Sequence, residues 1–182
     1  MIYLSHFAAH KTSEGTKYAI SNGVPGWAPM EKFGLLVPKW SDVEAAKLGQ
    51  MEWRAFAERY WHRLSDRTGE ILGECERGRL QDVTLFCWCT PGRFCHRRVL
   101  AAWLHRHKVP VTLDGVLVTD SFHVGAAEQT CGWCGKIALV DSDGRFLPHD
   151  FPKRSKLVGQ CDGVGLTLEG QERQRNEYAL DT

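Results

Sequence analysis

Short apolar runs alternate with longer amphipathic stretches along the first two thirds of the chain. Residues 1–7 predict a first strand, and residues 17–21 a second, shorter one. The stretch "DVTLFCW" at 82–88 is nearly all apolar, which is typical of a central parallel strand covered on both faces. Residues 109–113 predict another strand, and Asp114-Gly115 would turn it into 116–122 as a hairpin.

The longer stretches predict helices. Ser41 and Glu44 fit a capping box, so we expect a helix to begin at Ser41. An apolar stripe continues to residue 64, and Gly49 is expected to break it in two. Residues 66–77 predict a further helix, in which Cys75 would be a small, half-buried hydrophobe. Residues 95–107 predict the last helix, with an inward stripe made of Val99, Leu100, Trp103 and Leu104.

This order of strand, helices, strand, helix and strand predicts an α/β three-layer sandwich with a mostly parallel sheet, over residues 1–125. From residue 126 the chain has few large aliphatic residues and many turn formers. Segments this small usually need a disulfide or a bound metal ion to be stable. We therefore expect residues 126–182 to form a small zinc-stabilised module and tail.

Composition adds two limits. The 182 residues are 43% hydrophobic and carry a net charge of +1, so a real core is possible, but no global field draws the chain to nucleic acid or membrane. The chain has no apolar run of membrane-spanning length and no export signal at its start. We expect a soluble, cytoplasmic protein.

The second cysteine group predicts a structural zinc site. Cys131 and Cys134 form C-x-x-C beside glycines, and His149 and Cys161 complete a tetrahedral set. The alternative is a reduced cysteine pair with an exposed His149. The segment 128–165 also resembles a zinc-ribbon-like segment found at the ends of many actinobacterial and phage proteins, which implies zinc.

The first cysteine group stands at a strand-to-helix junction. Cys87 and Cys89 are two apart at the end of the central strand, so their side chains would share a face. Cys95, His96 and Arg97 open the next helix, where free amides and the helix dipole favour anions and thiolates. Ligands of α/β proteins usually bind beyond the carboxyl ends of the strands, so a catalytic site is the preferred interpretation.

Two other interpretations of this group stay open. Cys87, Cys89, Cys95 and His96 could bind a second metal, either zinc or an iron–sulfur centre. Alternatively, the thiols pack the sheet edge and the histidine and arginine only satisfy the helix start. Consecutive residues at a helix start diverge by about 100°, so we expect His96 or Arg97 to bond backbone.

The junction resembles two bacterial and phage families. The runs "VTLFCWC" and "PGRFCHRRVLAAWL", with "YAISNGVPGW" upstream, resemble the family named "domain of unknown function 488", in which the position of Cys89 is commonly acidic. The run "CWCTPGRFCH" is similar to the signature of "domain of unknown function 4326". The resemblance covers roughly residues 1–125. It implies the fold, a site at the junction, and an association with phage DNA metabolism.

The preferred function is an enzyme acting on a nucleotide, nucleoside or nucleobase, in phage or bacterial DNA-modification chemistry. Arg97 and the helix amides would hold a phosphate or carboxylate. Cys95 would be the nucleophile or a polarising group, and His96 the acid or base. The residues expected to line or close the pocket are Cys87, Cys89, Ser5, His6, Ser21 and Asn22, and Trp27 could stack a base.

The alternative from another class is a non-catalytic protein that docks on nucleic acid. The basic patch Lys153, Arg154 and Lys156 lies beside the expected zinc segment and would contact phosphates.

Overall fold

A computed structural model describes residues 1–13, 15–91, 95–120, 122, 124, 127–130 and 137–140 of the chain. The chain divides into two compact units, the first made of residues 1–91 and 95–122 and the second of residues 92–94 and 123–182. The helices of the first unit are η1 (Phe7–Ala9), η2 (Gly34–Leu36), α1 (Trp40–Lys47), α2 (Trp53–Ser65), α3 (Thr68–Glu76) and α4 (His96–Arg106). Its strands are β1 (Ile2–His6), β2 (Thr16–Ala19), β3 (Glu31–Lys32), β4 (Val83–Cys87), β5 (Val111–Leu113) and β6 (Val116–Leu117).

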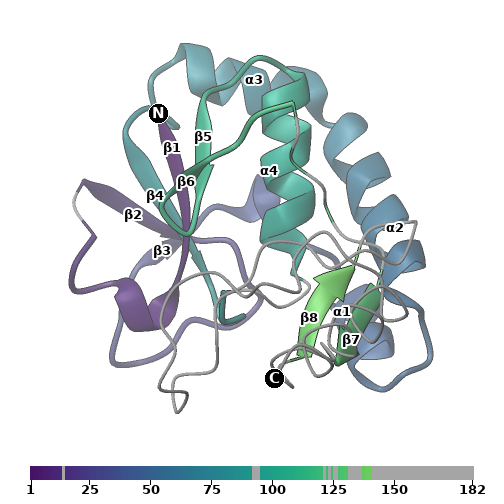
Figure 1. Ribbon diagram of the computed structural model, residues 1–182. Helices are drawn as coiled ribbons and strands as arrows, with labels where there is room; N and C mark the ends of the chain where they lie inside the picture. The colour runs from purple at the N-terminus through teal and green to yellow at the C-terminus, as the bar shows by residue number, and fades with distance from the viewer. Residues whose placement is uncertain are drawn as a thin grey trace, which may run out of the picture. The chain divides into compact units, whose positions relative to one another are not determined.

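The first unit is built on a six-stranded sheet in the order β3-β2-β4-β1-β5-β6 (Figure 1). Neighbouring strands are parallel except for β6, which returns antiparallel to β5. All five residues of β4 are buried, and β4 lies between β2 and β1 as the apolar run at 82–88 predicts. The predicted α/β class with a mostly parallel sheet is confirmed.

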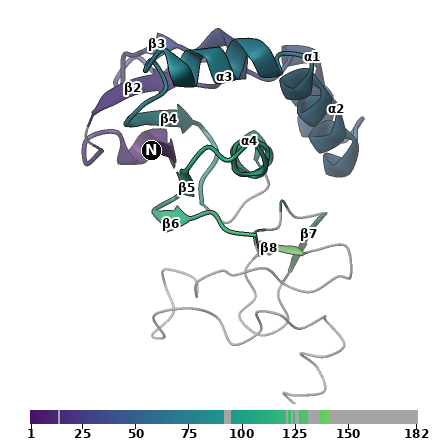
Figure 2. The ribbon, with the colours of Figure 1, turned by 90° about the horizontal axis from the view of Figure 1, so that it is seen from above.

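One face of the sheet is covered by helices. Leu4, Leu85 and Leu113 lie in register on β1, β4 and β5, and all three are buried. Figure 2 shows the four α-helices on one side of the strands, with α4 beside β4 and β5. The predicted inward stripe of α4, which includes Trp103 and Leu104, is buried in this layer.

The opposite face is covered only in part. Phe7 from η1 packs with Ala19, Ala28 and Phe86 into a small core near the carboxyl ends of the strands. Nearer the start of the strands the same face stays open, and Tyr3 is 42% exposed there. The covering on this side therefore comes from η1 and the connection between β2 and β3.

Two predictions about helix ends, the start at Ser41 and the break at Gly49, have different outcomes. The prediction that Ser41 caps a helix is wrong: α1 begins at Trp40, and its N-cap residue is Lys39, which makes no side-chain capping bond. A capping bond contributes only about 1 kcal/mol, so a capping sequence alone does not fix where a helix begins. The break at Gly49 is confirmed, since α1 ends at Lys47, α2 begins at Trp53, and Gly49 has a φ of +70°.

The Asp114-Gly115 turn is confirmed. It joins β5 to β6, and both residues have positive φ, 51° for Asp114 and 88° for Gly115. Asparagine, aspartate and glycine tolerate this left-handed backbone best, which explains why this pair occupies the turn. The turn places the Asp114 side chain just beyond the carboxyl end of β5.

In the second unit, β7 (Ala127–Thr130) pairs antiparallel with β8 (Ile137–Val140). The apolar run at 137–140 predicts a strand, whereas β7 has the polar sequence AEQT and gives no such signal. The expected zinc ligands Cys131, Cys134, His149 and Cys161 lie outside the described residues. So does the basic patch of Lys153, Arg154 and Lys156, and the boundary expected after residue 125 stays a prediction.

Among the helices that the structure describes, none combines the length and the apolar character needed to cross a lipid bilayer.

Candidate functional site

Three thiols meet at the junction of β4 and α4. The sulfur atoms of Cys87, Cys89 and Cys95 all lie within 4.8 Å of one another, and the Sγ atoms of Cys87 and Cys95 are 3.2 Å apart. Cys87 is the last residue of β4, and Cys95 is the N-cap residue of α4. Both are buried, whereas Cys89 is partly exposed. We refer to these three residues as the sulfur cluster.

Backbone amides also point at these sulfurs. The amide of Cys89 donates to Cys87 Sγ at 3.3 Å, and the amide of Arg97 donates to Cys95 Sγ at 3.5 Å. In each case the donor follows the cysteine by two residues. Such donors stabilise negative charge on sulfur. The Cys95 sulfur therefore replaces the usual oxygen of a helix cap.

The three thiols do not ionise alike. Burial opposes ionisation of Cys95, but hydrogen bonds from Cys87 and Cys89 and the charge of His96 hold its pKa well below the usual thiol range. Burial and the hydrogen bonds with its neighbours raise the pKa of Cys87. A hydrogen bond with Cys87 lowers the pKa of Cys89, but its bond to Cys95 and its burial raise it to about 12. The favoured state is one thiolate, Cys95, between two protonated thiols.

Hydrogen bonds of Arg97 hold the sulfur cluster in place. Its side chain is only 2% exposed, and Nη1 donates to Asp114 Oδ1 at 2.5 Å while Nη2 donates to the carbonyl of Cys89 at 2.8 Å. Burial lowers the pKa of Arg97, but the charges of the cluster and of Asp114 outweigh it, so that pKa lies above its usual value. Arg97 is thus the helix-start residue that bonds backbone. It links β4, α4 and the turn after β5.

His96 lies on the helix-covered side of the cluster. Its Nδ1 is 3.7 Å from Cys95 Sγ, and its ring meets the ring of Tyr60 edge-on at 5.8 Å between centroids. His96 is 7% exposed, and within the described part of the chain its Nε2 has no hydrogen-bond partner. Tyr60 donates its hydroxyl to the carbonyl of Leu36 at 2.5 Å. Burial, and next the charge of Cys95, raise the pKa of Tyr60.

The pocket residues expected from the sequence fall into separate places. His6 is in register with Cys87, so it shares the face and the edge of the sulfur cluster. Ser5 faces the other way. Ser21 donates to the carbonyl of Gly23 at 2.7 Å and Asn22 to that of Pro38 at 3.1 Å, so both side chains shape the loop after β2. Their proposed contacts with substrate stay predictions.

Trp27 belongs to an aromatic group at the carboxyl ends of the strands, on the face of the sheet opposite to the sulfur cluster. Its ring contacts Phe7 and Trp88, and the indole nitrogen of Trp88 donates to the carbonyl of Gly23 at 2.9 Å. Trp88 follows the last residue of β4, and its contact with Phe7, which stacks on Phe86, places its ring on the side of the sheet opposite to Cys87.

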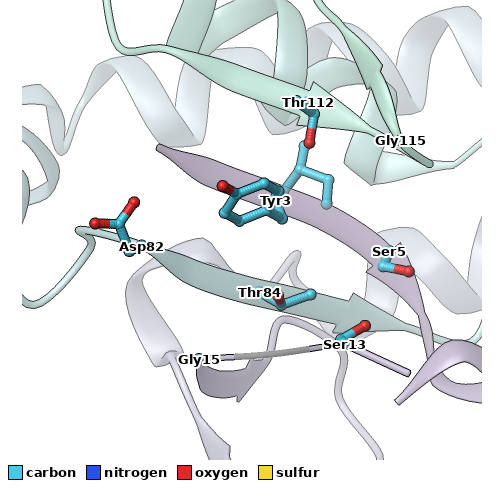
Figure 3. Close-up of a pocket in the computed structure, with 9 residues that line it drawn as sticks. Tyr3, Ser5, Ser13, Gly15, Asp82, Thr84, Thr112 and Gly115 are labelled. Carbon is cyan, nitrogen blue, oxygen red and sulfur yellow. The ribbon is translucent and has the colours of Figure 1, made fainter. Parts of the chain in front are cut away.

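A separate cavity lies on the open face of the sheet. Its volume is about 510 Å³, and Figure 3 shows Tyr3, Thr84 and Thr112 side by side on three strands, with Asp82 at one end and Ser5 and Ser13 at the other. This cavity, rather than the sulfur cluster, receives the hydroxyl of Ser5. Alternation along β1 explains the difference, because Ser5 and His6 are consecutive.

Sequence patterns missed three residues of this region. The sequence indicates Asp114 only as a turn residue, Tyr60 only as part of a helical stripe, and Trp88 only as the end of the apolar strand run at 82–88. Each acquires its contact from a distant segment, and only Trp88 carried a local signal, its position inside Cys-x-Cys.

One of the comparisons with known proteins identifies a family. No curated protein matches the chain, and no solved structure matches it. The family model DUF488-N3a, described as "Active DUF488-N3 subclade", matches residues 11–108, which are more than half of the chain. The matched region runs from before β2 to just beyond α4 and includes the whole sulfur cluster. The chain therefore belongs to the DUF488-N3a subclade of the DUF488 family.

Proposed function

We propose that the protein is an enzyme that acts on a nucleotide, nucleoside or nucleobase through the Cys95 sulfur at the junction of β4 and α4. The observation that carries the proposal is the set of hydrogen-bonding groups around Cys95 Sγ, which are the thiol of Cys87, the Nδ1 of His96 and the amide of Arg97. A histidine and a helix N-terminus beside a sulfur favour its thiolate, which is the nucleophilic form of cysteine.

The chemistry follows from the three different thiol states. Cys95 supplies the electron pair for a bond to an electrophilic carbon of the substrate. As the bond to sulfur forms, a π bond of that carbon opens and its electron pair goes to the attached nitrogen or oxygen. That atom takes the proton of Cys87 or Cys89, which are both protonated because their pKa values are raised. The negative charge thus moves from Cys95 to the thiol that gave up its proton, and the overall charge is unchanged.

Arg97 and His96 have different roles in this proposal. Arg97 positions the cluster, because two of its nitrogens are already bonded to Asp114 and Cys89. His96 contacts the Cys95 sulfur through Nδ1, and its charge favours the thiolate.

A substrate screen over nucleotides and modified nucleosides tests the proposal, with wild type compared with Cys95→Ser and Cys75→Ser. Cys75 is a half-buried thiol on α3 and serves as the matched control. We expect turnover that Cys95→Ser abolishes and Cys75→Ser leaves unchanged. Turnover that survives Cys95→Ser would show that the site is assigned wrongly.

A second candidate is a metal centre, because three sulfurs within 4.8 Å of one another could hold a metal ion. Tetrahedral zinc with bonds of 2.3 Å needs ligand atoms about 3.8 Å apart, so Cys87 and Cys95 would separate slightly. His96 Nδ1 lies 3.7 Å from Cys95 Sγ, but among the described residues the ligand atoms that lie within 4.8 Å of one another are the three sulfurs alone, so His96 would have to move to become a fourth ligand.

Metal analysis separates this candidate from the zinc proposed for residues 126–182. Loading with Co²⁺ should give thiolate-to-metal absorbance that Cys87→Ser removes if the sulfur cluster is the site. Cys131→Ser should remove it if only the C-terminal set binds. An unchanged spectrum in Cys87→Ser rules out the metal at the cluster.

A further inference from the structure

Two half-exposed tryptophans meet at the carboxyl edge of the sheet. Trp27 is 56% exposed and Trp88 is 54% exposed, and their ring planes are 88° apart with centroids at 6.4 Å. The buried ring of Phe7 closes the group, edge-on to both tryptophans. We call Phe7, Trp27 and Trp88 the aromatic corner. Exposed indole surface of this size is unfavourable in water unless something covers it.

The corner is held in place although it is exposed. Trp88 is fixed by the hydrogen bond from its indole nitrogen to the carbonyl of Gly23, and Trp27 by the rings of Phe7 and His10. Rings fixed before a ligand arrives lose little conformational entropy on binding. The corner therefore has the properties of a preformed binding surface.

Two lysines flank the corner. Lys17 Nζ donates to the carbonyl of His10, whose ring lies 5.1 Å from that of Trp27. Lys32 Nζ donates to the carbonyl of Asn22, next to the Gly23 that holds Trp88. Within the described residues neither lysine forms an ion pair with a carboxylate. Their charges are thus left to attract an anion.

From this geometry we infer that the aromatic corner, with Lys17 and Lys32, binds a nucleobase that carries a phosphate. A planar base stacks on the face of one indole and meets the other edge-on, as the right angle between them allows. The lysines contact the phosphate. A quaternary ammonium ligand is disfavoured because the same lysines repel it, and a neutral sugar would make no use of them.

This subsite lies across the end of β4 from the sulfur cluster, since Trp88 packs on Phe7 and Phe86, and Phe86 and Cys87 point to opposite sides of the strand. The inference deepens the proposed function and rests on it only for the link to thiol chemistry. The base in the corner is then a recognition element and not the group that reacts. The same chemistry is offered by a free nucleotide and by one unit of a single strand.

Isothermal titration calorimetry on the full chain tests the inference. The probes are thymidine 5′-monophosphate, thymidine, inorganic phosphate, methyl glucoside, tetramethylammonium chloride and a short oligothymidylate. We expect the monophosphate to bind more tightly than thymidine or phosphate alone, and the affinity to fall as salt is added. Tighter binding of the oligothymidylate than of the monophosphate identifies a strand as the source; equal binding identifies the free nucleotide.

Variants locate the site. Trp27→Ala and Trp88→Ala should each weaken nucleotide binding by about tenfold, the usual effect of one stacked base, and Lys17→Gln or Lys32→Gln should weaken it several-fold. Trp40 is the matched control: it is 51% exposed, and Lys47 Nζ lies 5.8 Å from its ring. Trp40→Ala and Lys47→Gln should leave binding unchanged.

Three results would overturn the inference: no nucleotide binding by wild type, equal binding by Trp88→Ala, or tighter binding of the glucoside or the ammonium ion. Cys95→Ser should bind nucleotide as wild type does. Loss of thiol-dependent turnover without loss of binding, or the reverse, therefore shows which of the two proposals has failed.

Discussion

The sulfur cluster and the cavity over the open sheet face lie on opposite sides of the same strands, and they differ in volume and in the side chains that line them. The cavity has volume, about 510 Å³, and a lining of hydroxyls and one carboxylate. The cluster offers three thiols, a histidine and a charged arginine in mutual contact within a buried junction. The thiols and the open cavity are therefore separate in this unit, and the cavity by itself does not identify a reactive group.

The two regions also differ in how much hydration free energy their polar groups lose when the protein folds. Tyr3 in the cavity is partly exposed to solvent, so its hydroxyl loses little hydration free energy. Arg97 is charged and nearly fully buried, so its partners must compensate for the water it has lost. Substitutions should therefore act strongly at the cluster and weakly at the cavity.

The largest expected effect is the loss of a thiolate. Because the pKa of Cys95 is lowered, its thiolate absorbance in the ultraviolet should persist as the pH falls below the usual thiol range, about 8.5. Cys95→Ser should remove this component entirely, and Cys75→Ser should not. A pH titration in which wild type and Cys95→Ser coincide would contradict the ionisation pattern.

The same shift predicts the pH dependence of stability. The folded-state pKa of Cys95 lies below its unfolded value, so its ionisation stabilises the fold fully above the unfolded pKa. That contribution is lost as the pH falls through the folded pKa. The difference in unfolding free energy between wild type and Cys95→Ser should shrink over this window, as measured by urea unfolding at several pH values.

Arg97→Ala should lower the free energy of unfolding by about 3–5 kcal/mol, the usual result of breaking a buried ion pair. It leaves the carboxylate of Asp114 and the carbonyl of Cys89 without their donor. Urea unfolding measures the loss. Arg54→Ala is the control, because Arg54 and Glu58 are exposed, and a loss below 1 kcal/mol in Arg97→Ala would show that Arg97 does not fasten the junction.

Tyr60→Phe should cost about 1 kcal/mol, because it removes the donor to the buried carbonyl of Leu36. Tyr3→Phe makes the same chemical change in the cavity, where the side chain is 42% exposed, and should be nearly neutral. Thermal or urea unfolding of both variants compares the regions directly. Equal losses would remove the contrast between them.

The smallest effect is expected from Thr112→Val in the cavity lining. Thr112 is partly exposed on β5, and valine fits a strand equally well, so stability should change by less than about 0.5 kcal/mol. The thiolate titration of Cys95 should be unchanged, since Thr112 faces the other side of the sheet. A shifted titration would show that the two faces are coupled.

Local sequence patterns predicted which helices and strands exist better than they predicted where each of them begins. The apolar run at 82–88 and the stripe of α4 each depend on near neighbours in the chain, and both predictions are confirmed. The start of α1 was misplaced because a capping sequence such as that at Ser41 fixes a helix end only weakly, and the helix begins one residue earlier, at Trp40. β7 was missed because its polar residues have no apolar alternation, and its pairing with β8 defines it.

The sequence by itself determined that three cysteines, a histidine and an arginine stand at a strand-to-helix junction, because strand and helix periods and turn residues are encoded locally. The tertiary structure alone decided which of them are used and how. Asp114 reaches Arg97 from 17 positions away, and Gly23 holds Trp88 from 65 positions away. Such contacts depend on the order and register of the strands, which bring distant segments to one edge of the sheet and which no local pattern contains.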